Sequence, residues 1–275
     1  MEKLLVNKNS GLDLKVLVKN VIIGGGEKVI ISGPCSVEEY DNMYAIAKGL
    51  KKVGVHILRG GAFKPRTSPY DFQGSKEEGL KILKSVGNEF NMPIVTEVMD
   101  SKDIDLVLNY ADMLQIGSRN MYNYSLLKEV GKLKTPILLK RGMSATLSEW
   151  LYAAEYILSS GNENVVLCER GIRTFETYTR NTLDLSIVAA IKQKYRIPII
   201  VDPSHGTGKR ELVESMSLAS IAAGADGLMI ESHVDPDNAL SDSRQTVSID
   251  TVDEIARNVK KFQEFFNSNT KNKYY

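Results

Sequence analysis

Charged and metal-binding side chains follow the short apolar runs of this sequence, one group after almost every run. In chain order they are Cys35, Arg59 with Lys64-Pro65-Arg66-Thr67, Glu97, Arg119, Lys140, Arg170, His205 and Glu231. The residues that begin or precede the runs are ordinary, among them Pro93, Pro136 and Pro198. Surface solvation does not explain why these residues follow the runs and do not precede them. This uneven distribution predicts that the catalytic groups lie at one end of a set of aligned strands.

The cations of this set predict an anionic substrate. They are Arg59, Lys64, Arg66, Arg119, Lys140 and Arg170. In one cavity they would repel one another strongly, because the protein lowers the local dielectric, so an anion must occupy the cavity. Arg presents a planar fork suited to phosphate and carboxylate, and Lys a point charge, which predicts one or two substrates with both groups. The alternative is that some cations pair with loop acids such as Glu169.

A second constellation, Cys35, His205, Glu231 and Asp242, offers sulfur, nitrogen and oxygen donors. The first three follow or end the first, seventh and eighth apolar runs, and the first and last strands of a closed barrel are neighbours. A mixed donor set suits a borderline divalent cation such as Mn²⁺, Fe²⁺, Co²⁺ or Zn²⁺ more than Ca²⁺. The alternative is that Cys35 is a buried apolar residue, which is our interpretation of Cys168.

The elements that must position these groups alternate between apolar runs and amphipathic stretches, a pattern typical of parallel strands joined by helices. The predicted strands are Val29–Ser36, His56–Phe63, Pro93–Val98, Met113–Ser118, Pro136–Arg141, Val165–Arg170, Ile197–Ser204 and Gly227–Ser232. The predicted helices are Glu38–Val53, Lys76–Phe90, Lys102–Asn109, Tyr124–Val130, Ala145–Ser160, Arg180–Tyr195, Leu212–Ala223 and Asp250–Phe266. Eight such pairs predict an α/β fold, a (β/α)₈ TIM barrel. The alternative, a doubly wound open sheet, would usually have fewer strands and a Gly-rich nucleotide turn.

Outside the barrel, residues 1–28 are predicted to form an N-terminal extension, a β-hairpin from Lys3–Val6 and Val21–Ile23 that caps one mouth. Residues 29–267 are then the catalytic barrel, and residues 268–275 are expected to be a flexible tail. His56 is interpreted as structural, Trp150 as packing between barrel and helix, and His233 is left open between loop support and the site.

Composition excludes several classes of function. The chain has 275 residues, a formal net charge of +1 and no concentrated basic run, so affinity for nucleic acid or membrane is not expected. With only two cysteines, no apolar segment in Met1–Ser10 and no long apolar run, a cytoplasmic protein is expected.

Six motifs in order resemble those of 3-deoxy-7-phosphoheptulonate (DAHP) synthase, in the short form called type I beta. They are Gly33-Pro34-Cys35-Ser36, the run Arg59–Pro69 (RGGAFKPRTSP), Gln115–Asn120 (QIGSRN), Leu139–Gly142 (LKRG), Cys168–Gly171 (CERG) and Val201–His205 (VDPSH). The resemblance covers about Val29 to Val247. It implies a metal-dependent, aldol-like condensation of phosphoenolpyruvate with erythrose 4-phosphate and water that releases phosphate. This is the first step of the shikimate pathway to chorismate and the aromatic amino acids.

The resemblance also implies roles for individual residues. The phosphate of phosphoenolpyruvate would be held by Arg119, Lys140 and Arg170, and its carboxylate and reacting end would lie near Arg59 and Lys64. The sugar phosphate would be bound by Arg66 and Thr67. The divalent metal would be held by Cys35, His205, Glu231 and Asp242. Lys64 is a candidate proton donor to the developing alkoxide, and Glu97 a candidate for orienting or deprotonating the attacking water. Relatives have Gly-Pro after the aspartate where this chain has Ser243-Arg244, so the loop shape and the role of Arg244 stay open.

Two alternatives remain at this point. The related 3-deoxy-octulosonate 8-phosphate synthase takes arabinose 5-phosphate, and it usually carries Ala-Asn after the lysine where this chain has Pro65, a shorter and stiffer wall. A non-catalytic phosphosugar sensor would be expected to lack Cys35, Glu97 or His205. No fused regulatory domain is expected in this chain, and therefore no feedback inhibition through one. A homo-oligomer, dimer or tetramer, is expected, and the native metal is open.

Overall fold

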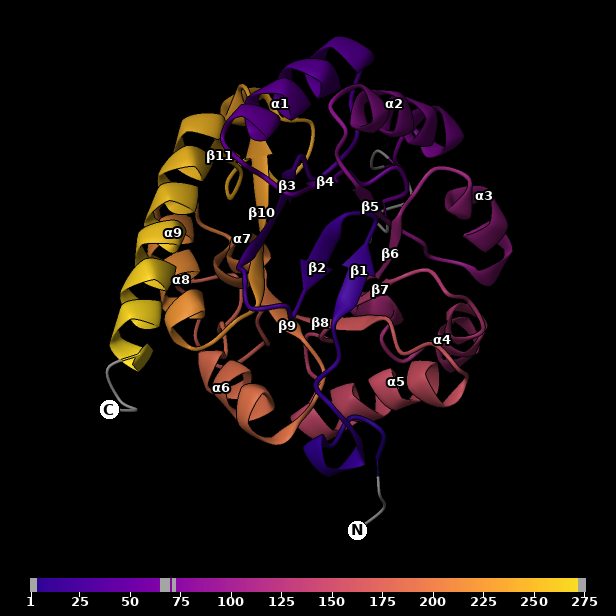
Figure 1. The fold of residues 1–275 in the computed structure, drawn as a ribbon. Coiled ribbons are helices and arrows are strands. Elements are labelled where there is room, and N and C mark those ends of the chain that lie inside the picture. Colours follow the sequence, from indigo (N-terminus) through magenta and orange to yellow (C-terminus); the bar gives the residue numbers. More distant parts are fainter. Residues whose placement is uncertain (1–3, 65–69, 71–72, 272–275) are drawn as a thin grey trace.

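The computed structural model describes residues 4–64, 70 and 73–271 and shows a closed barrel of parallel strands inside a ring of helices (Figure 1). The barrel strands are β3 (Val29–Gly33), β4 (Ile57–Arg59), β5 (Ile94–Glu97), β6 (Met113–Ile116), β7 (Ile137–Lys140), β8 (Val165–Glu169), β9 (Ile199–Val201) and β10 (Gly227–His233). They pair in chain order, and β10 pairs with both β9 and β3, which closes the sheet. The predicted (β/α)₈ barrel is confirmed, and the open sheet is excluded.

The helices between the strands are α1 (Tyr40–Lys52), α2 (Lys76–Glu89), α3 (Ile104–Leu108), α4 (Tyr124–Gly131), α5 (Leu147–Ser159), α6 (Leu185–Lys194), α7 (Pro203–Thr207), α8 (Arg210–Ala222) and α9 (Ile249–Lys271). Short 3₁₀ turns lie at Lys8–Ser10, Ser101–Asp103, Ser118–Asn120 and Pro236–Asn238. A two-residue strand, β11 (Val247–Ser248), pairs with the end of β10.

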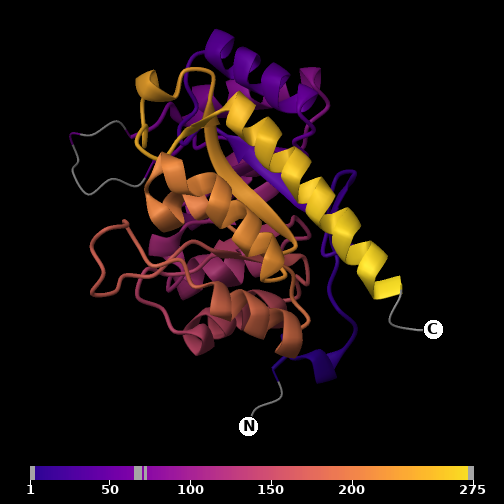
Figure 2. The ribbon, with the colours of Figure 1, turned by 90° about the vertical axis from the view of Figure 1, so that its left-hand side faces the viewer.

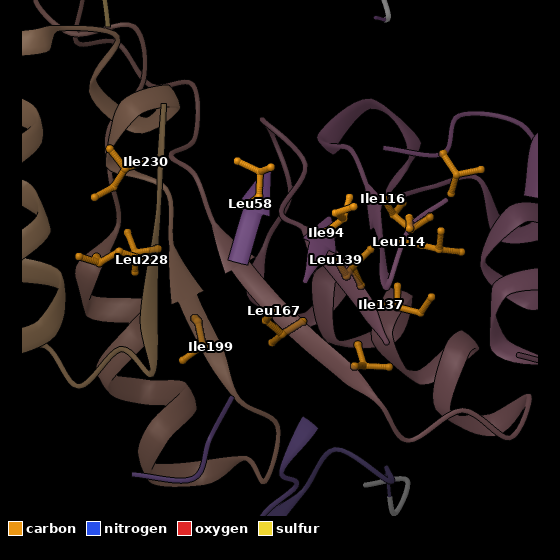
Figure 3. Close-up of a cluster of buried hydrophobic side chains, with 14 of the residues drawn as sticks. Leu58, Ile94, Leu114, Ile116, Ile137, Leu139, Leu167, Ile199, Leu228 and Ile230 are labelled. Atoms are coloured by element: carbon orange, nitrogen blue, oxygen red, sulfur yellow. The ribbon is translucent and has the colours of Figure 1, made fainter. Parts of the chain in front are cut away.

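Side chains on both faces of the barrel strands are buried, which explains why the strands are continuous apolar runs. The outward face packs against the helices with residues such as Leu58, Leu114 and Leu228 (Figure 3). The inward face forms a separate cluster inside the barrel that includes Ile57 and Cys168. Cys168 is therefore the buried apolar residue that the sequence predicts, and burial raises the pKa of its thiol to about 12.

A β-hairpin of β1 (Val16–Val18) and β2 (Val21–Ile23) lies across the N-terminal end of the barrel (Figure 1). Val16, Val18 and Ile23 are buried in the same cluster as the inward-facing strand residues. The predicted cap is present, but its predicted first strand, Lys3–Val6, is wrong. The two-residue connection after Val18 has Lys19 at φ +52°, which suits a tight hairpin turn and selects the nearer strand.

Two predicted helices differ from the observed ones by five residues at one end, and one observed helix was not predicted. The helix predicted from Arg180 begins at Leu185, because the side chain of Asp184 accepts a hydrogen bond from the backbone N–H of Ile187 and caps it. The last helix runs on to Lys271. The short helix α7, which carries His205, was predicted as the end of a strand and the start of a loop.

The two mouths of the barrel differ in what covers them. Figure 2 shows the β1–β2 hairpin on one side and the long loops after β8 and β10 on the opposite side. Those loops follow the C-terminal strand ends, where chemistry gathers in barrels of this type. In the part of the chain described, no helix combines the length and apolar character needed to cross a membrane.

Candidate active site

A cavity of about 200 Å³ lies at the C-terminal mouth of the barrel. Of the residues predicted for the site, Arg59, Lys64, Glu97, Arg119, Lys140, Arg170, His205 and Asp242 line it. Cys35 and Glu231 lie against this wall, within 4.8 Å of the donor atoms of His205 and Asp242. Pro65, Arg66 and Thr67 lie outside the described residues. The strand ends thus bring together predicted residues from all parts of the chain.

The four predicted metal-binding residues form one group. One donor atom from each of Cys35, His205, Glu231 and Asp242 lies within 4.8 Å of the other three. Glu231 comes from β10, Cys35 follows β3, His205 lies on α7, and Asp242 lies in the loop before β11. Because β3 and β10 are paired neighbours, closure of the barrel places the thiol beside the carboxylate.

The protonation of His205 indicates what this group can bind. Burial lowers the pKa of His205, which leaves the ring neutral near pH 7. Nδ1 lies 2.7 Å from the Asp202 carboxylate, and because a carboxylate can only accept, Nδ1 carries the proton. The lone pair of Nε2 then faces Glu231 Oε1 at 3.4 Å. Two acceptors that face each other favour a cation between them, and the donor set fits a borderline divalent metal.

The thiol of Cys35 is held protonated by its surroundings. Burial raises its pKa to about 12, and the negative charge of Glu231 adds to the rise, against the opposing effect of Lys64. The thiol donates to Asp242 Oδ2 at 2.9 Å, and Lys64 Nζ donates to the sulfur at 2.8 Å. Because a metal-bound cysteine is a thiolate, loading the group with a metal would release this proton.

Two of the predicted cations pair with buried acids, as the alternative from the sequence allowed, although the acids are not loop glutamates. Arg59 Nη1 lies 2.8 Å from Glu231 Oε1, and Lys140 Nζ lies 2.6 Å from Asp202 Oδ2. Burial alone would raise the pKa of Glu231, but the neighbouring His205 and Arg59 outweigh burial and hold the pKa at about 2. Both acids are therefore ionised.

Arg119 and Arg170, which also line the cavity, differ in exposure. Arg119 lies in the 3₁₀ turn after β6 and is exposed, whereas Arg170 follows β8 and is buried. Burial lowers the pKa of Arg170; Asp202 opposes this shift and the nearby charge of Arg180 adds to it. This excess of positive charge around one cavity suits an anionic substrate.

Glu97 ends β5 and points at the same cavity. Its Oε2 accepts a hydrogen bond from Gln115 Nε2 at 3.3 Å. A Cβ atom at position 117 would overlap the Glu97 carboxylate, so this close approach requires glycine there. The backbone after β6 therefore fixes where the carboxylate lies.

The sequence reasoning missed Asp202 and Arg180. The fully buried Asp202 pairs with both Lys140 and His205, and its pKa lies well below the usual range because these two partners outweigh burial. Its position directly after a strand was a signal that could have found it. Arg180 lines the cavity and reaches Asp242 Oδ1 at 3.4 Å. It was missed because it was assigned to a helix.

The other residues that the sequence singled out, two histidines and one tryptophan, have structural contacts. His56 Nδ1 accepts from the backbone N–H of Ile30 at the N-terminal end of the barrel. His233 Nε2 lies 3.2 Å from Glu38, and Nδ1 lies 2.7 Å from the backbone oxygen of Asp235, which favours loop support. The indole of Trp150 is buried against β7 and donates to Leu139 O.

Fold and site together define a barrel enzyme with a candidate metal group and a cationic cavity at its C-terminal mouth. Residues 6–268 match the DAHP synthetase I family. The phospho-2-dehydro-3-deoxyheptonate aldolase of Thermotoga maritima is 47% identical over 252 residues, which are 92% of this chain and 75% of that protein. A 2-dehydro-3-deoxyphosphooctonate aldolase of Syntrophotalea carbinolica is 29% identical over 272 residues, covering 92% of this chain and 97% of its own.

Solved structures agree with this match. The crystal structure of the Thermotoga maritima DAHP synthase superposes with a TM-score of 0.94 at 44% identity, covering 97% of this chain and 78% of that one. A truncated form of the same organism's enzyme gives 0.88 at 42% identity, covering 95% and 97%. The chain belongs to the DAHP synthetase I family, and its activity is that of a 3-deoxy-7-phosphoheptulonate synthase. The octonate-forming alternative is the weaker one, because those relatives are far less similar.

Proposed function

We propose that Cys35, His205, Glu231 and Asp242 hold the divalent metal of this synthase. The observation that carries the proposal is the convergence of sulfur, nitrogen and two carboxylate donors within 4.8 Å, with the Nε2 lone pair of His205 facing a carboxylate oxygen. Lewis-acid polarisation of an aldehyde carbonyl is the chemistry that such a cation supplies when bound. Mn²⁺, Fe²⁺, Co²⁺ and Zn²⁺ all suit this donor set.

The cations of the cavity would hold phosphoenolpyruvate. Arg119, Lys140 and Arg170 line the cavity and would bind its phosphate. Arg59 contacts Glu231 and Lys64 contacts Cys35, and these two cations would bind its carboxylate. Guanidinium groups bind such anions through paired hydrogen bonds. Arg66 and Thr67 would bind the phosphate of erythrose 4-phosphate. Holding two anions in a reactive alignment supplies a large entropic part of the catalysis.

Lys64 and Glu97 would move the protons. The enol carbon of phosphoenolpyruvate bonds to the aldehyde carbon, and the aldehyde oxygen becomes an alkoxide that takes a proton from Lys64. Water adds to the second carbon and gives its proton to Glu97. The resulting hemiketal loses inorganic phosphate, whose charge the cations stabilise. Lys64 Nζ lies 2.8 Å from Cys35 Sγ, beside the position where the aldehyde would be polarised.

Chelation tests the metal proposal. Protein stripped with a chelator should release no phosphate from phosphoenolpyruvate and erythrose 4-phosphate, and Mn²⁺ or Fe²⁺ should restore the reaction. Cys35→Ala should abolish it, while Cys168→Ala serves as the matched control because that cysteine is equally buried but lies inside the barrel. Activity that survives complete chelation, or an active Cys35→Ala variant, would contradict the proposal.

The second substrate is tested by comparing aldose phosphates. With metal present, erythrose 4-phosphate should be consumed faster than arabinose 5-phosphate, and the reverse preference would refute the assignment of the aldose.

We also propose that the enzyme works in a reducing cytoplasm, since both cysteines are free and Cys35 must stay reduced to bind metal. The expected homo-oligomer is a prediction for size-exclusion chromatography with light scattering.

A further inference from the structure

The buried side-chain amide of Gln245 contacts Glu231 of the candidate metal group. Gln245 is 2% exposed and lies two residues before β11. Its Nε2 donates to Glu231 Oε2 at 2.6 Å, and its Oε1 accepts from Arg180 Nη1 at 3.2 Å. The orientation of the amide is unambiguous, because a carboxylate can only accept and a guanidinium can only donate. Gln245 thus links Glu231 to Arg180.

The backbone holds Gln245 in place. Its N–H and the N–H of Thr246 both donate to Asp242 O, at 3.1 and 3.2 Å, and Thr246 Oγ1 donates to the same oxygen. Asp242 has φ +56°, so these bonds hold a left-handed turn. The pairing of Ser232 with Val247 then ties the end of this turn to β10, the strand that carries Glu231. Asp242 and Gln245 are therefore parts of one rigid loop.

In each carboxylate of the group, one oxygen faces another candidate metal ligand and the other oxygen contacts Gln245 or Arg180. Gln245 occupies Oε2 of Glu231, which leaves Oε1 facing His205 Nε2 at 3.4 Å. Arg180 Nη1 lies 3.4 Å from Oδ1 of Asp242, while Oδ2 faces the sulfur of Cys35 at 2.9 Å. Oε1 also accepts from Arg59 Nη1 at 2.8 Å, so what distinguishes the two oxygens is that only Oε1 faces His205. Each carboxylate thus presents one oxygen to another residue of the candidate metal group.

We propose that Gln245 is a positioning residue that makes Glu231 a one-oxygen ligand, and that Arg180 does the same for Asp242. The inference rests on the proposed metal role of the four residues. Its consequence is metal selectivity: Ca²⁺ takes six to eight oxygens and commonly binds carboxylates through both oxygens, whereas a four-donor site with single oxygens suits Mn²⁺ or Zn²⁺. Gln245 and Arg180 therefore disfavour Ca²⁺ without touching the metal.

The test measures metal binding in the absence of substrates. Mn²⁺ is titrated into metal-free wild type, Gln245→Leu and Arg180→Gln, with free Mn²⁺ followed by electron paramagnetic resonance, and Ca²⁺ is used as competitor. Gln245→Leu should bind Mn²⁺ about 10- to 100-fold more weakly, the usual effect of losing a partner of a metal ligand. It should also let Ca²⁺ compete at lower concentration. Arg180→Gln should weaken Mn²⁺ binding less, because the Arg180 side chain is 45% exposed.

A matched control and a kinetic readout separate positioning from general damage. Gln263→Leu removes an amide that donates to Gly26 O beside α9, far from the site, and should leave Mn²⁺ affinity unchanged. In assays, excess Mn²⁺ should return kcat of Gln245→Leu toward the wild-type value, while the Mn²⁺ concentration needed for half activation rises. A variant that is only misfolded would not recover.

The outcomes distinguish this inference from the metal proposal. If wild type binds Mn²⁺ and Cys35→Ala does not, but folded Gln245→Leu binds as tightly as wild type, the positioning role of Gln245 is wrong and the metal site stands. If Cys35→Ala binds like wild type, the metal proposal itself fails. Should Gln245→Leu not fold, Arg180→Gln decides, because unchanged Mn²⁺ affinity and unchanged Ca²⁺ competition in that variant would overturn the inference.

Discussion

Replacing Asp202 by asparagine should damage both the stability of the barrel and the metal group. Three donors converge on its two oxygens: Lys140 Nζ at 2.6 Å, His205 Nδ1 at 2.7 Å and the backbone N–H of His205 at 2.9 Å. Asparagine offers one acceptor oxygen and an NH₂ group that can only donate. At least one donor loses its partner, and Lys140 keeps a buried charge without a counter-ion.

The magnitude follows from burial. The Lys140 and Asp202 side chains are 5% and 0% exposed, and breaking such a pair from one side costs about 3–5 kcal/mol. At about 2–4 °C per kcal/mol, that corresponds to a fall in Tm of roughly 6–20 °C. The loss should depend on pH. The pKa of Asp202 is lowered in the folded state, so its stabilisation is full above the unfolded pKa of about 3.9 and fades as pH falls below it. Wild type and variant should therefore converge in acid.

Thermal unfolding of metal-free protein at pH 7 and across the acid range measures this effect. Asp226→Asn is the matched control: Asp226 is also buried and holds Lys192 at 2.7 Å, but it lies at the N-terminal end of the barrel and Lys192 is 36% exposed. Water can solvate Lys192, so we expect a smaller loss of Tm and no change in Mn²⁺ affinity. Asp202→Asn should in addition weaken Mn²⁺ binding about 10- to 100-fold, because His205 loses the partner that sets its tautomer. A Tm within roughly 2 °C of wild type, the shift expected for about 1 kcal/mol, would refute the reasoning.

Three further substitutions test the site and its support. Gly117→Ala should lower kcat about 100-fold with little loss of Tm, because a methyl group there displaces the Glu97 carboxylate; unchanged kcat would remove Glu97 from the reaction. Thr146→Ala should cost about 1 kcal/mol in denaturant unfolding and leave kcat unchanged, since it breaks the capping box with Glu149 at the start of α5; no loss of stability would mean that the cap is redundant. Trp150→Ala should cost about 3–5 kcal/mol because the side chain is fully buried; a smaller loss would show that the helix layer collapses into the space.

Much of the fold could be predicted because its pattern is local. Strands buried on both faces are continuous apolar runs, and eight of them alternating with amphipathic stretches leave few architectures. Predictions failed where a single turn or helix cap set the bounds of an element. Val16–Val18 pairs with β2 because a two-residue turn at Lys19 brings it there, whereas the predicted strand Lys3–Val6 rested on the turn-prone residues Asn9, Ser10 and Gly11 that lie between it and β2. Arg180 was wrongly predicted to lie in a helix, because the helix begins only after its N-cap residue, Asp184.

By itself the sequence determined the barrel and the residue types that gather at its mouth, since a residue that follows a parallel strand must lie at the C-terminal edge. Only the tertiary structure decided which of these groups touch. Arg59 pairs with Glu231 across 172 residues and Lys140 with Asp202 across 62, and no periodicity predicts such partners. Closure of the barrel sets them, by bringing β10 against β3 and burying ionised groups that must then find a counter-charge. The same closure places Gln245 beside Glu231, where its amide donates to Oε2.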